Sequence, residues 1–71
     1  MAELPGAAVK RLITKNGGEL RTSASAVQLA VAAAEDYIRR LAQEASASAQ
    51  RERRKTIMDS DIQRAREALG G

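Results

Sequence analysis

Histidine and cysteine are both absent from this sequence of 71 residues. Without them no disulfide can form, and only carboxylates remain as metal ligands. A hydroxyl nucleophile would need a lysine or carboxylate base, in a pocket that so short a chain is too small to form. The acidic pairs Glu35-Asp36 and Asp59-Ser60-Asp61 are expected to be solvated and to cap a helix, respectively. The composition therefore predicts neither an enzyme nor a metal site, and we expect no cofactor.

Aromatic residues and long apolar runs are also scarce. Tyr37 is the only aromatic side chain, so the core is expected to be aliphatic and rich in alanine. No apolar run approaches the ~18 residues of a membrane span, and no signal-peptide pattern opens the chain. We therefore expect a soluble, intracellular protein with a single domain over residues 1–71. A domain this small is marginally stable alone, so oligomerisation is expected.

What the sequence does contain is one long helical pattern. Neither glycine nor proline occurs between Arg21 and Lys55, and strong helix formers dominate from Ala26 to about Gln50. With Ser23 or Thr22 as its N-cap, a helix of about 28 residues would be about 42 Å long. That length exceeds the width of a domain of this size. The apolar stripe of such a helix needs a partner to cover it.

Two shorter helices are expected on either side of the long one. Pro5 suits the first position of a helix that Asn16-Gly17-Gly18 ends, and Asp59 or Ser60 is expected to cap the other. Leu20 is expected to return to the core, and residues 55–58 to be extended. Helical spacing and the expected pairing of chains predict a dimer core of Leu12, Val27, Ala30, Ala34, Tyr37, Ile38, Leu41 and Ile62.

The charge is mildly basic but unevenly placed. Twelve Lys and Arg against nine Asp and Glu give a formal charge of +3, and four of the five residues from Arg51 to Lys55 are cationic. Such clustering is typical of nucleic-acid binding, although cations at a helix C-terminus also simply favour its dipole. In an antiparallel pair of long helices, Arg21 of one chain would lie near the cluster of the other. Two such corners would be about 40 Å apart, close to one DNA turn of ~34–36 Å.

Motifs along nearly the whole chain resemble those of the tailless archaeal histones. They are Glu3-Leu4-Pro5, Arg11, Gly17, Arg21 before Ser23, Ala26-Val27, Glu35-Asp36-Tyr37, and Arg54-Lys55-Thr56-Ile57 followed by Asp61-Ile62. Ser25-Ala26-Val27 and Thr56-Ile57-Met58 also resemble eukaryotic core histones. The resemblance implies an all-α histone fold of a short, a long and a short helix, forming an intertwined handshake homodimer. It also implies that the protein binds double-stranded DNA without sequence specificity, bends it and compacts it. The expected location is the cytoplasm, in association with the nucleoid and its chromatin.

The same resemblance implies which residues hold DNA. Arg21 would enter a minor groove with Thr56 buttressing it, while Lys10 and Arg11 would meet phosphates at the centre of the dimer. Arg54 and Lys55 would contact phosphates at the paired loops, and Arg54 would also form a structural salt bridge with Asp61. The full expected DNA-binding set is Lys10, Arg11, Arg21, Thr22, Ser23, Arg53, Arg54, Lys55 and Thr56.

Assembly beyond the dimer is expected to be weak or absent. Histone dimers join through the end of the long helix and the third helix, usually by apolar residues and a histidine. The corresponding candidate tetramer face here is Ser48, Arg51, Asp61 and Arg64. Cations facing their symmetry mates repel unless Asp61 and Glu52 offset them, so bridging or bending of short DNA sites is expected rather than a continuous superhelix. Two alternatives remain: a histone-fold interaction subunit that heterodimerises within a larger complex, and a helical scaffold without DNA affinity.

Overall fold

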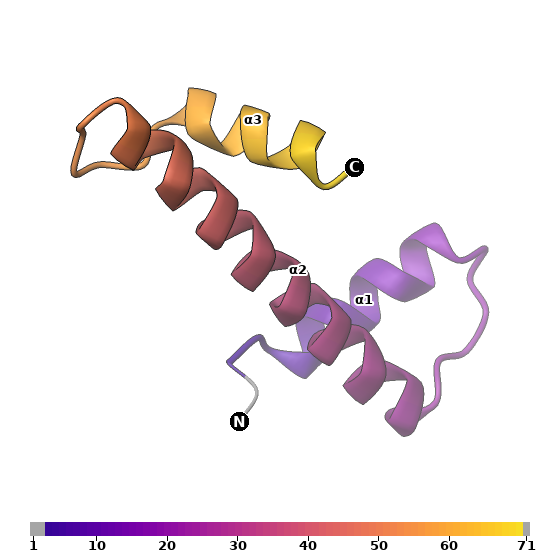
Figure 1. The fold of residues 1–71 in the computed structure, drawn as a ribbon. Helices are drawn as coiled ribbons and strands as arrows, with labels where there is room; N and C mark the ends of the chain where they lie inside the picture. Colours follow the sequence, from indigo (N-terminus) through magenta and orange to yellow (C-terminus); the bar gives the residue numbers. More distant parts are fainter. Residues whose placement is uncertain (1–2, 71) are drawn as a thin grey trace. The chain divides into compact units, whose positions relative to one another are not determined.

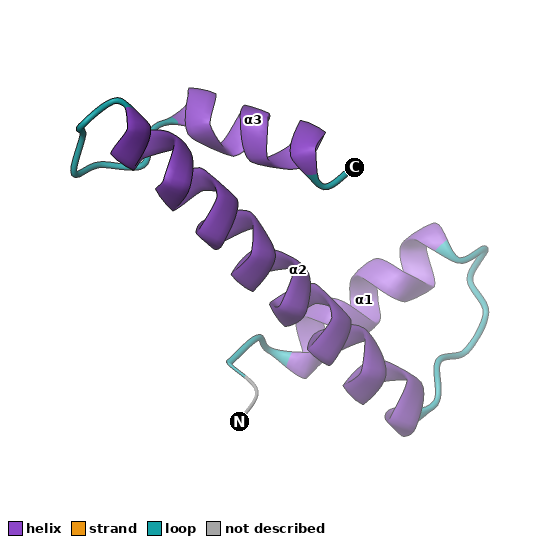
Figure 2. Cartoon of the chain, viewed as in Figure 1, coloured by secondary structure: helices purple, strands orange, loops and turns teal. Residues whose placement is uncertain are grey.

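The computed structural model describes residues 3–70, and Met1, Ala2 and Gly71 lie outside the described residues. It contains the helices α1 (Gly6–Asn16), α2 (Ala24–Arg51) and α3 (Asp59–Ala68), as Figure 1 shows. Loops alone connect them, and no strand occurs between residues 3 and 70 (Figure 2). The predicted all-α class with short, long and short helices is therefore confirmed. Within this range no helix is long and apolar enough to cross a membrane.

The long helix α2 extends over 28 residues because neither glycine nor proline interrupts it. Ser23, rather than Thr22, caps its start: the Ser23 hydroxyl accepts the Ala26 N–H at 3.1 Å, and the Ser23 carbonyl accepts the Val27 N–H at 3.0 Å. These bonds satisfy amide donors that have no partner within the helix. The chain divides into two compact units, residues 1–36 and residues 37–71. The N-terminal part of α2 belongs to the first unit and its C-terminal part to the second.

In the first unit, α1 packs against the N-terminal half of α2. Val31 is the buried apolar residue here, at 5% exposure. Leu4, Gly6, Val27 and Val31 line a small cavity of about 200 Å³. Much of the apolar surface in this unit is therefore left uncovered by the chain itself.

The start of α1 differs slightly from expectation. Pro5 is the N-cap rather than the first helical residue, with an extended backbone and a carbonyl that accepts the Val9 N–H at 3.2 Å. Glu35, expected to be solvated, instead accepts backbone N–H groups of Glu3 and of Leu4, the latter at 2.9 Å. This carboxylate therefore fixes the segment that leads into α1.

A glycine turn ends α1. Gly18 and Glu19 both adopt left-handed backbone conformations, with φ of 74° and 64°. The Glu19 N–H donates to the Thr14 carbonyl at 3.0 Å, which closes the last turn of the helix. Gly17 cannot be replaced without a shift, because a Cβ there would lie 2.7 Å from the Ile13 carbonyl oxygen. Leu20 does not return to the core of the single chain as expected: this side chain is 73% exposed.

In the second unit, α3 lies beside the C-terminal half of α2. Ala45, Ala49 and Ala65 are buried, and such small side chains let two helices approach closely. Met58, with an extended backbone, is the N-cap of α3. The prediction that Asp59 or Ser60 caps this helix is therefore wrong. The Met58 N–H donates to the Asp61 carboxylate at 2.8 Å, which aligns the first turn.

Candidate nucleic-acid interface

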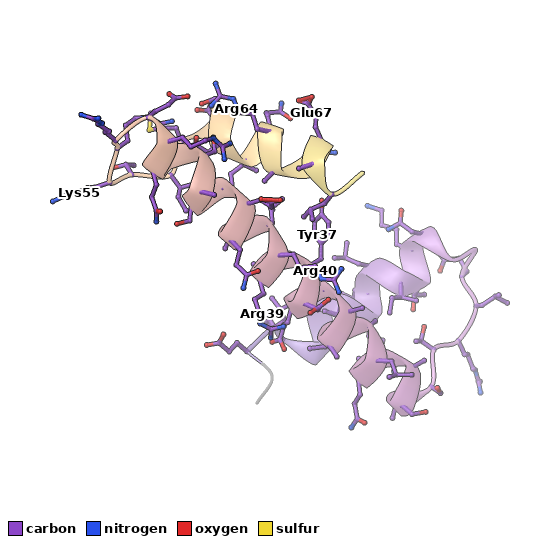
Figure 3. The ribbon with its side chains drawn as sticks, viewed as in Figure 1. Tyr37, Arg39, Arg40, Lys55, Arg64 and Glu67 are labelled. Carbon is purple, nitrogen blue, oxygen red and sulfur yellow. The ribbon has the colours of Figure 1, made fainter. Side chains whose placement is uncertain are left out.

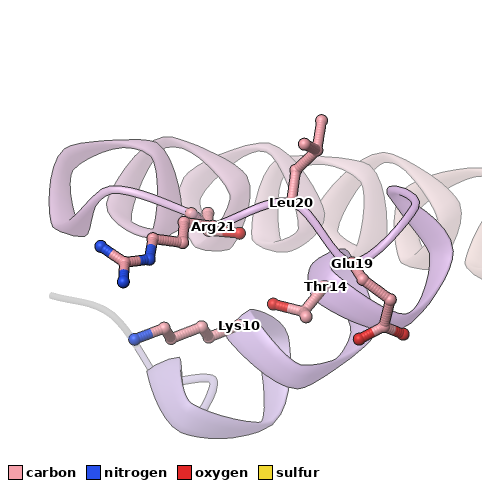
Figure 4. Close-up of a pocket in the computed structure, with 6 residues that line it drawn as sticks. Lys10, Thr14, Glu19, Leu20 and Arg21 are labelled. Atoms are coloured by element: carbon pink, nitrogen blue, oxygen red, sulfur yellow. The ribbon is translucent and has the colours of Figure 1, made fainter.

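The first basic site consists of the predicted residues on α1 and the following loop. Lys10, Arg21 and Thr22 line one cavity of about 400 Å³, together with Thr14, Glu19 and Leu20 (Figure 4). Lys10 and Arg21 are exposed, and Thr22 is half-buried. The structure therefore brings two of the predicted cations together within a single chain.

Arg11 and Ser23 occupy different surroundings from that pair. Arg11 lines a neighbouring hollow of about 390 Å³ that it shares with Lys10 and Lys15. The Ser23 hydroxyl caps the start of α2, where it accepts the Ala26 N–H. Ser23 therefore has a structural task, whereas Arg11 extends the positive surface along α1.

The second basic site is the loop of Arg53, Arg54, Lys55 and Thr56, which follows α2. The Arg54 N–H donates to the Ala49 carbonyl and the Arg53 N–H to the Gln50 carbonyl, both at 2.9 Å. This pattern is a Schellman motif, whose left-handed residue is usually glycine. Here Arg53 takes that place, with φ of 56°. A cation therefore occupies a position where L-amino acids are strained.

Arg54 faces into the protein from this loop. Its guanidinium donates to both oxygens of Asp61, from Nη1 at 2.7 Å and from Nη2 at 2.9 Å. The same two nitrogens donate to the Thr56 carbonyl and to Glu52, each at 3.1 Å. Lys55, by contrast, points away from the loop (Figure 3). Arg54 therefore holds the loop in shape, and Lys55 presents its charge outward.

The Arg54–Asp61 ion pair belongs to a closed ring of polar side chains. The Ser48 hydroxyl donates to Asp61 at 2.7 Å and accepts from Arg64 Nη1 at 3.1 Å. Arg64 Nη1 also donates to Glu52 at 2.6 Å, and Glu52 pairs with Arg54. Two carboxylates thus balance two guanidiniums, and Ser48 closes the ring between α2 and α3.

The ring shifts the ionisation of its acidic and basic members. The Arg54 guanidinium, the Met58 N–H and the Ser48 hydroxyl hold the pKa of the fully buried Asp61 carboxyl well below its usual range. Hydrogen bonds from Arg64 and then Arg54 lower the pKa of Glu52. In return, Asp61 and Glu52 raise the pKa of Arg54. Asp61, Glu52 and Arg54 therefore stay charged at neutral pH, and the positive charge of Arg54 is compensated within the chain.

The structure places the four residues of the candidate tetramer face in different surroundings. Ser48 and Asp61 were expected there, but they are buried within the chain at 1% and 0% exposure because they form the closed ring. Arg64 is exposed but ion-paired with Glu52, which offsets its charge. The expected like-charge repulsion therefore rests mainly on Arg51, which is exposed at the end of α2.

Sequence reasoning missed that Ser48 closes a polar ring, whereas Glu52 was considered as a group that could offset the nearby cations. Ser48 lies on α2, and Glu52 comes four residues later, directly after the last residue of the helix; this spacing is the signal that could have indicated a polar patch facing α3. Ser48 was interpreted as part of the apolar stripe of the long helix and of the candidate tetramer face. Glu35, considered above, carried no local signal of its contact with residues 3–4.

Comparison with known proteins gives the family of this chain. No solved structure matches it. The family model described as histone-like transcription factor (CBF/NF-Y) and archaeal histone matches residues 2–65. That match covers most of the sequence and all three helices apart from the last turn of α3. The chain therefore belongs to the family of histone-like transcription factors and archaeal histones, and the predicted histone fold is confirmed.

Proposed function

We propose that this protein is an architectural, non-catalytic DNA-binding protein. It acts as a homodimer that binds double-stranded DNA without sequence preference, bends and compacts it, and associates with the chromosome. The observation that carries the proposal is the set of exposed cations on two loops, Arg21 before α2 and Arg53 and Lys55 after it, in a chain of the histone-like family. Contacts of this kind neutralise phosphates and read no bases.

The uncovered apolar surface supports the homodimer. None of the residues predicted for the dimer core is buried within the single chain. Leu12 is 61% exposed, Ile38 51% and Tyr37 40%. Large apolar side chains left in water along two helices are the mark of an interaction surface. A second copy of the chain, itself a single histone-fold domain over residues 1–71, would cover them in the handshake arrangement.

In such a dimer the loop before α2 of one chain would meet the loop after α2 of its partner. Arg21 would then enter a minor groove beside the partner's exposed Lys55, with Thr56 supporting it. Arg54 would stabilise the loop after α2 through its ion pair with Asp61 rather than by binding DNA phosphates. The dimer is the proposed binding unit, since Arg51 still faces outward where dimers would join.

A titration of random-sequence duplex DNA across salt concentrations tests this function. The double variant Arg21→Ala with Lys55→Ala removes one cation from each loop. Each lost phosphate contact lowers the slope of log affinity against log salt by about 0.9, so the variant loses about 1.8 per chain. The matched control, Arg51→Ala with Arg66→Ala, removes the same charge from exposed positions outside the proposed site. An unchanged slope in the loop variant would show that DNA binds elsewhere.

A second function is favoured by the matched family, whose description includes histone-like transcription factors as well as archaeal histones. In that alternative, the exposed apolar face of α1 and α2 would bind a different histone-fold chain inside a larger complex. The purified chain distinguishes the two. A homodimer unfolds cooperatively with a midpoint that rises with protein concentration, whereas an obligate heterodimer subunit is unfolded or aggregated when alone.

A further inference from the structure

Leu20, in the loop that leads into α2, is a large apolar side chain that its own chain leaves in water. It is 73% exposed, although its neighbours in the loop, Glu19, Arg21 and Thr22, are polar. Figure 4 shows Leu20 and the charged end of Arg21 leaving the loop in opposite directions. Since Arg21 faces DNA in the proposed complex, Leu20 faces away from the DNA. A single exposed leucine is ordinary on a protein surface, but this one has a counterpart on the other loop.

That counterpart is a hollow beside the loop that follows α2. Its volume is about 360 Å³, and it is lined by Ser46, Ala49, Gln50, Arg54, Lys55, Thr56 and Ile57. Ala49 is buried at the base of this unit, whereas Ile57 is 45% exposed. The hollow therefore has an aliphatic wall that the single chain does not cover.

The polar side chains around the hollow have their polar groups engaged or directed elsewhere. Gln50 Nε2 donates to the Ser46 hydroxyl at 3.1 Å. The Arg54 guanidinium is bound to Asp61, and Lys55 points away from the loop (Figure 3). An apolar side chain can therefore enter the hollow while these hydrogen bonds stay intact. The desolvation of a charge does not oppose its burial there.

The exposed leucine and the hollow lie on the two loops that the proposed homodimer brings together. Charge does not oppose their approach, because residues 19–22 carry one acid and one base, and so present no net charge to the cationic loop of the partner. We propose that Leu20 of one chain inserts into the hollow beside the partner's Ile57. The two-fold symmetry of a homodimer gives two such contacts. This inference rests on the proposed homodimer, and it adds an anchor outside the predicted helical core.

Cysteine pairing tests the contact, because the chain has no cysteine of its own. Leu20→Cys and Ile57→Cys proteins are mixed, refolded together under reducing conditions and then oxidised. A disulfide requires the two Cβ atoms to approach to about 3.5–4.5 Å, so the mixture should form a covalent dimer that neither variant forms alone. Leu29→Cys mixed with Ile57→Cys is the matched control. Leu29 is as exposed as Leu20 but lies on α2, and this pair should not cross-link.

The affinity of the dimer is the second measurement. Leu20→Ala should raise the dimer Kd roughly 10-fold per contact, and so about 100-fold for the two contacts. Leu20→Met keeps the apolar volume and should stay near the parent, and Leu29→Ala should leave the Kd unchanged. Ile57→Ala should also weaken the dimer. Combining it with Leu20→Ala should add little, because both substitutions remove the same contact.

Three results would overturn the contact while leaving the homodimer in place. The first is a mixture that cross-links no better than the Leu29→Cys control, and the second is a Leu20→Ala protein that dimerises and binds duplex DNA like the parent. The third is a Leu20→Ala protein that dimerises like the parent but binds duplex DNA more weakly, which would assign Leu20 to DNA. A parent protein that is a folded monomer would overturn the proposed homodimer itself, and the contact with it.

Discussion

At the scale of single residues, Arg53 combines a useful charge with an unfavourable backbone. Its left-handed φ of 56° suits glycine, which has no Cβ to collide with the following carbonyl. We predict that Arg53→Gly raises the free energy of unfolding by about 0.5–1 kcal/mol and weakens DNA binding. Denaturant unfolding at fixed protein concentration measures the first effect, and a DNA titration the second.

Arg53→Ala separates charge from conformation, because alanine keeps the Cβ and loses the guanidinium. This variant should bind DNA as weakly as Arg53→Gly without gaining its stability. If both variants bind DNA like the parent, Arg53 is not part of the interface. If glycine brings no stability, the turn is not strained.

Asp61 is the residue whose loss should be most damaging to stability. Asp61→Asn leaves the Arg54 guanidinium without its buried partner, and we predict a melting temperature lower by about 10 °C or more. Because the folded pKa of Asp61 lies below its unfolded value of about 3.9, its contribution is complete above that pH. The difference between parent and variant should thus be constant from about pH 5 to pH 8 and shrink below about pH 4.

Asp59→Asn is the control for this pH dependence. Asp59 lies in the first turn of the same helix, but it is exposed and interacts mainly with the helix dipole. Its replacement should lower the melting temperature by only about 1–3 °C. A pH-independent difference for Asp61→Asn down to about pH 2 would contradict the ion-pair explanation.

At the scale of elements, the start of α2 depends on one side chain. The Ser23 hydroxyl satisfies the Ala26 N–H, so Ser23→Ala should destabilise the protein by about 1 kcal/mol. Ser25→Ala is the matched control, since Ser25 lies inside the first turn of α2. Among residues 3–70, its hydroxyl forms a hydrogen bond with the Ser23 side chain but with no backbone group. Equal destabilisation by the two variants, measured by chemical unfolding, would show that Ser23 does not act as the cap.

The elements also show what could be predicted from the sequence. The extent of α2 followed from the absence of glycine and proline and from a capping serine, all of which are local signals. The polar ring was not predictable as a whole, because Ser48 and Asp61 meet only where two alanine-lined helices approach closely. The prediction for Leu20 failed for a similar reason: a loop residue has no periodicity that indicates its side. That Lys10 and Arg21 line the same cavity likewise depends on the path of the turn at Gly18 and Glu19, which the sequence does not fix.

At the scale of the whole molecule, the dimer is expected to depend on the apolar face of α2. Ile38→Glu would place a carboxylate in the proposed dimer core, and we predict that it gives monomers that unfold at lower denaturant concentration. Leu29→Glu provides the control, because Leu29 lies on the same helix and is 73% exposed but is not a predicted core residue. Light scattering coupled to gel filtration should therefore detect dimers for Leu29→Glu and not for Ile38→Glu. The reverse result would place the dimer on the other side of α2.

Sedimentation of the purified protein, with and without a short duplex of random sequence, tests the central claim most directly. It reports the size of the free protein and the stoichiometry of the complex in one experiment. The account predicts a stable dimer alone, and dimers that join the duplex at low salt and leave it as salt rises. A folded monomer, or a dimer that sediments apart from DNA at every salt concentration, would contradict it.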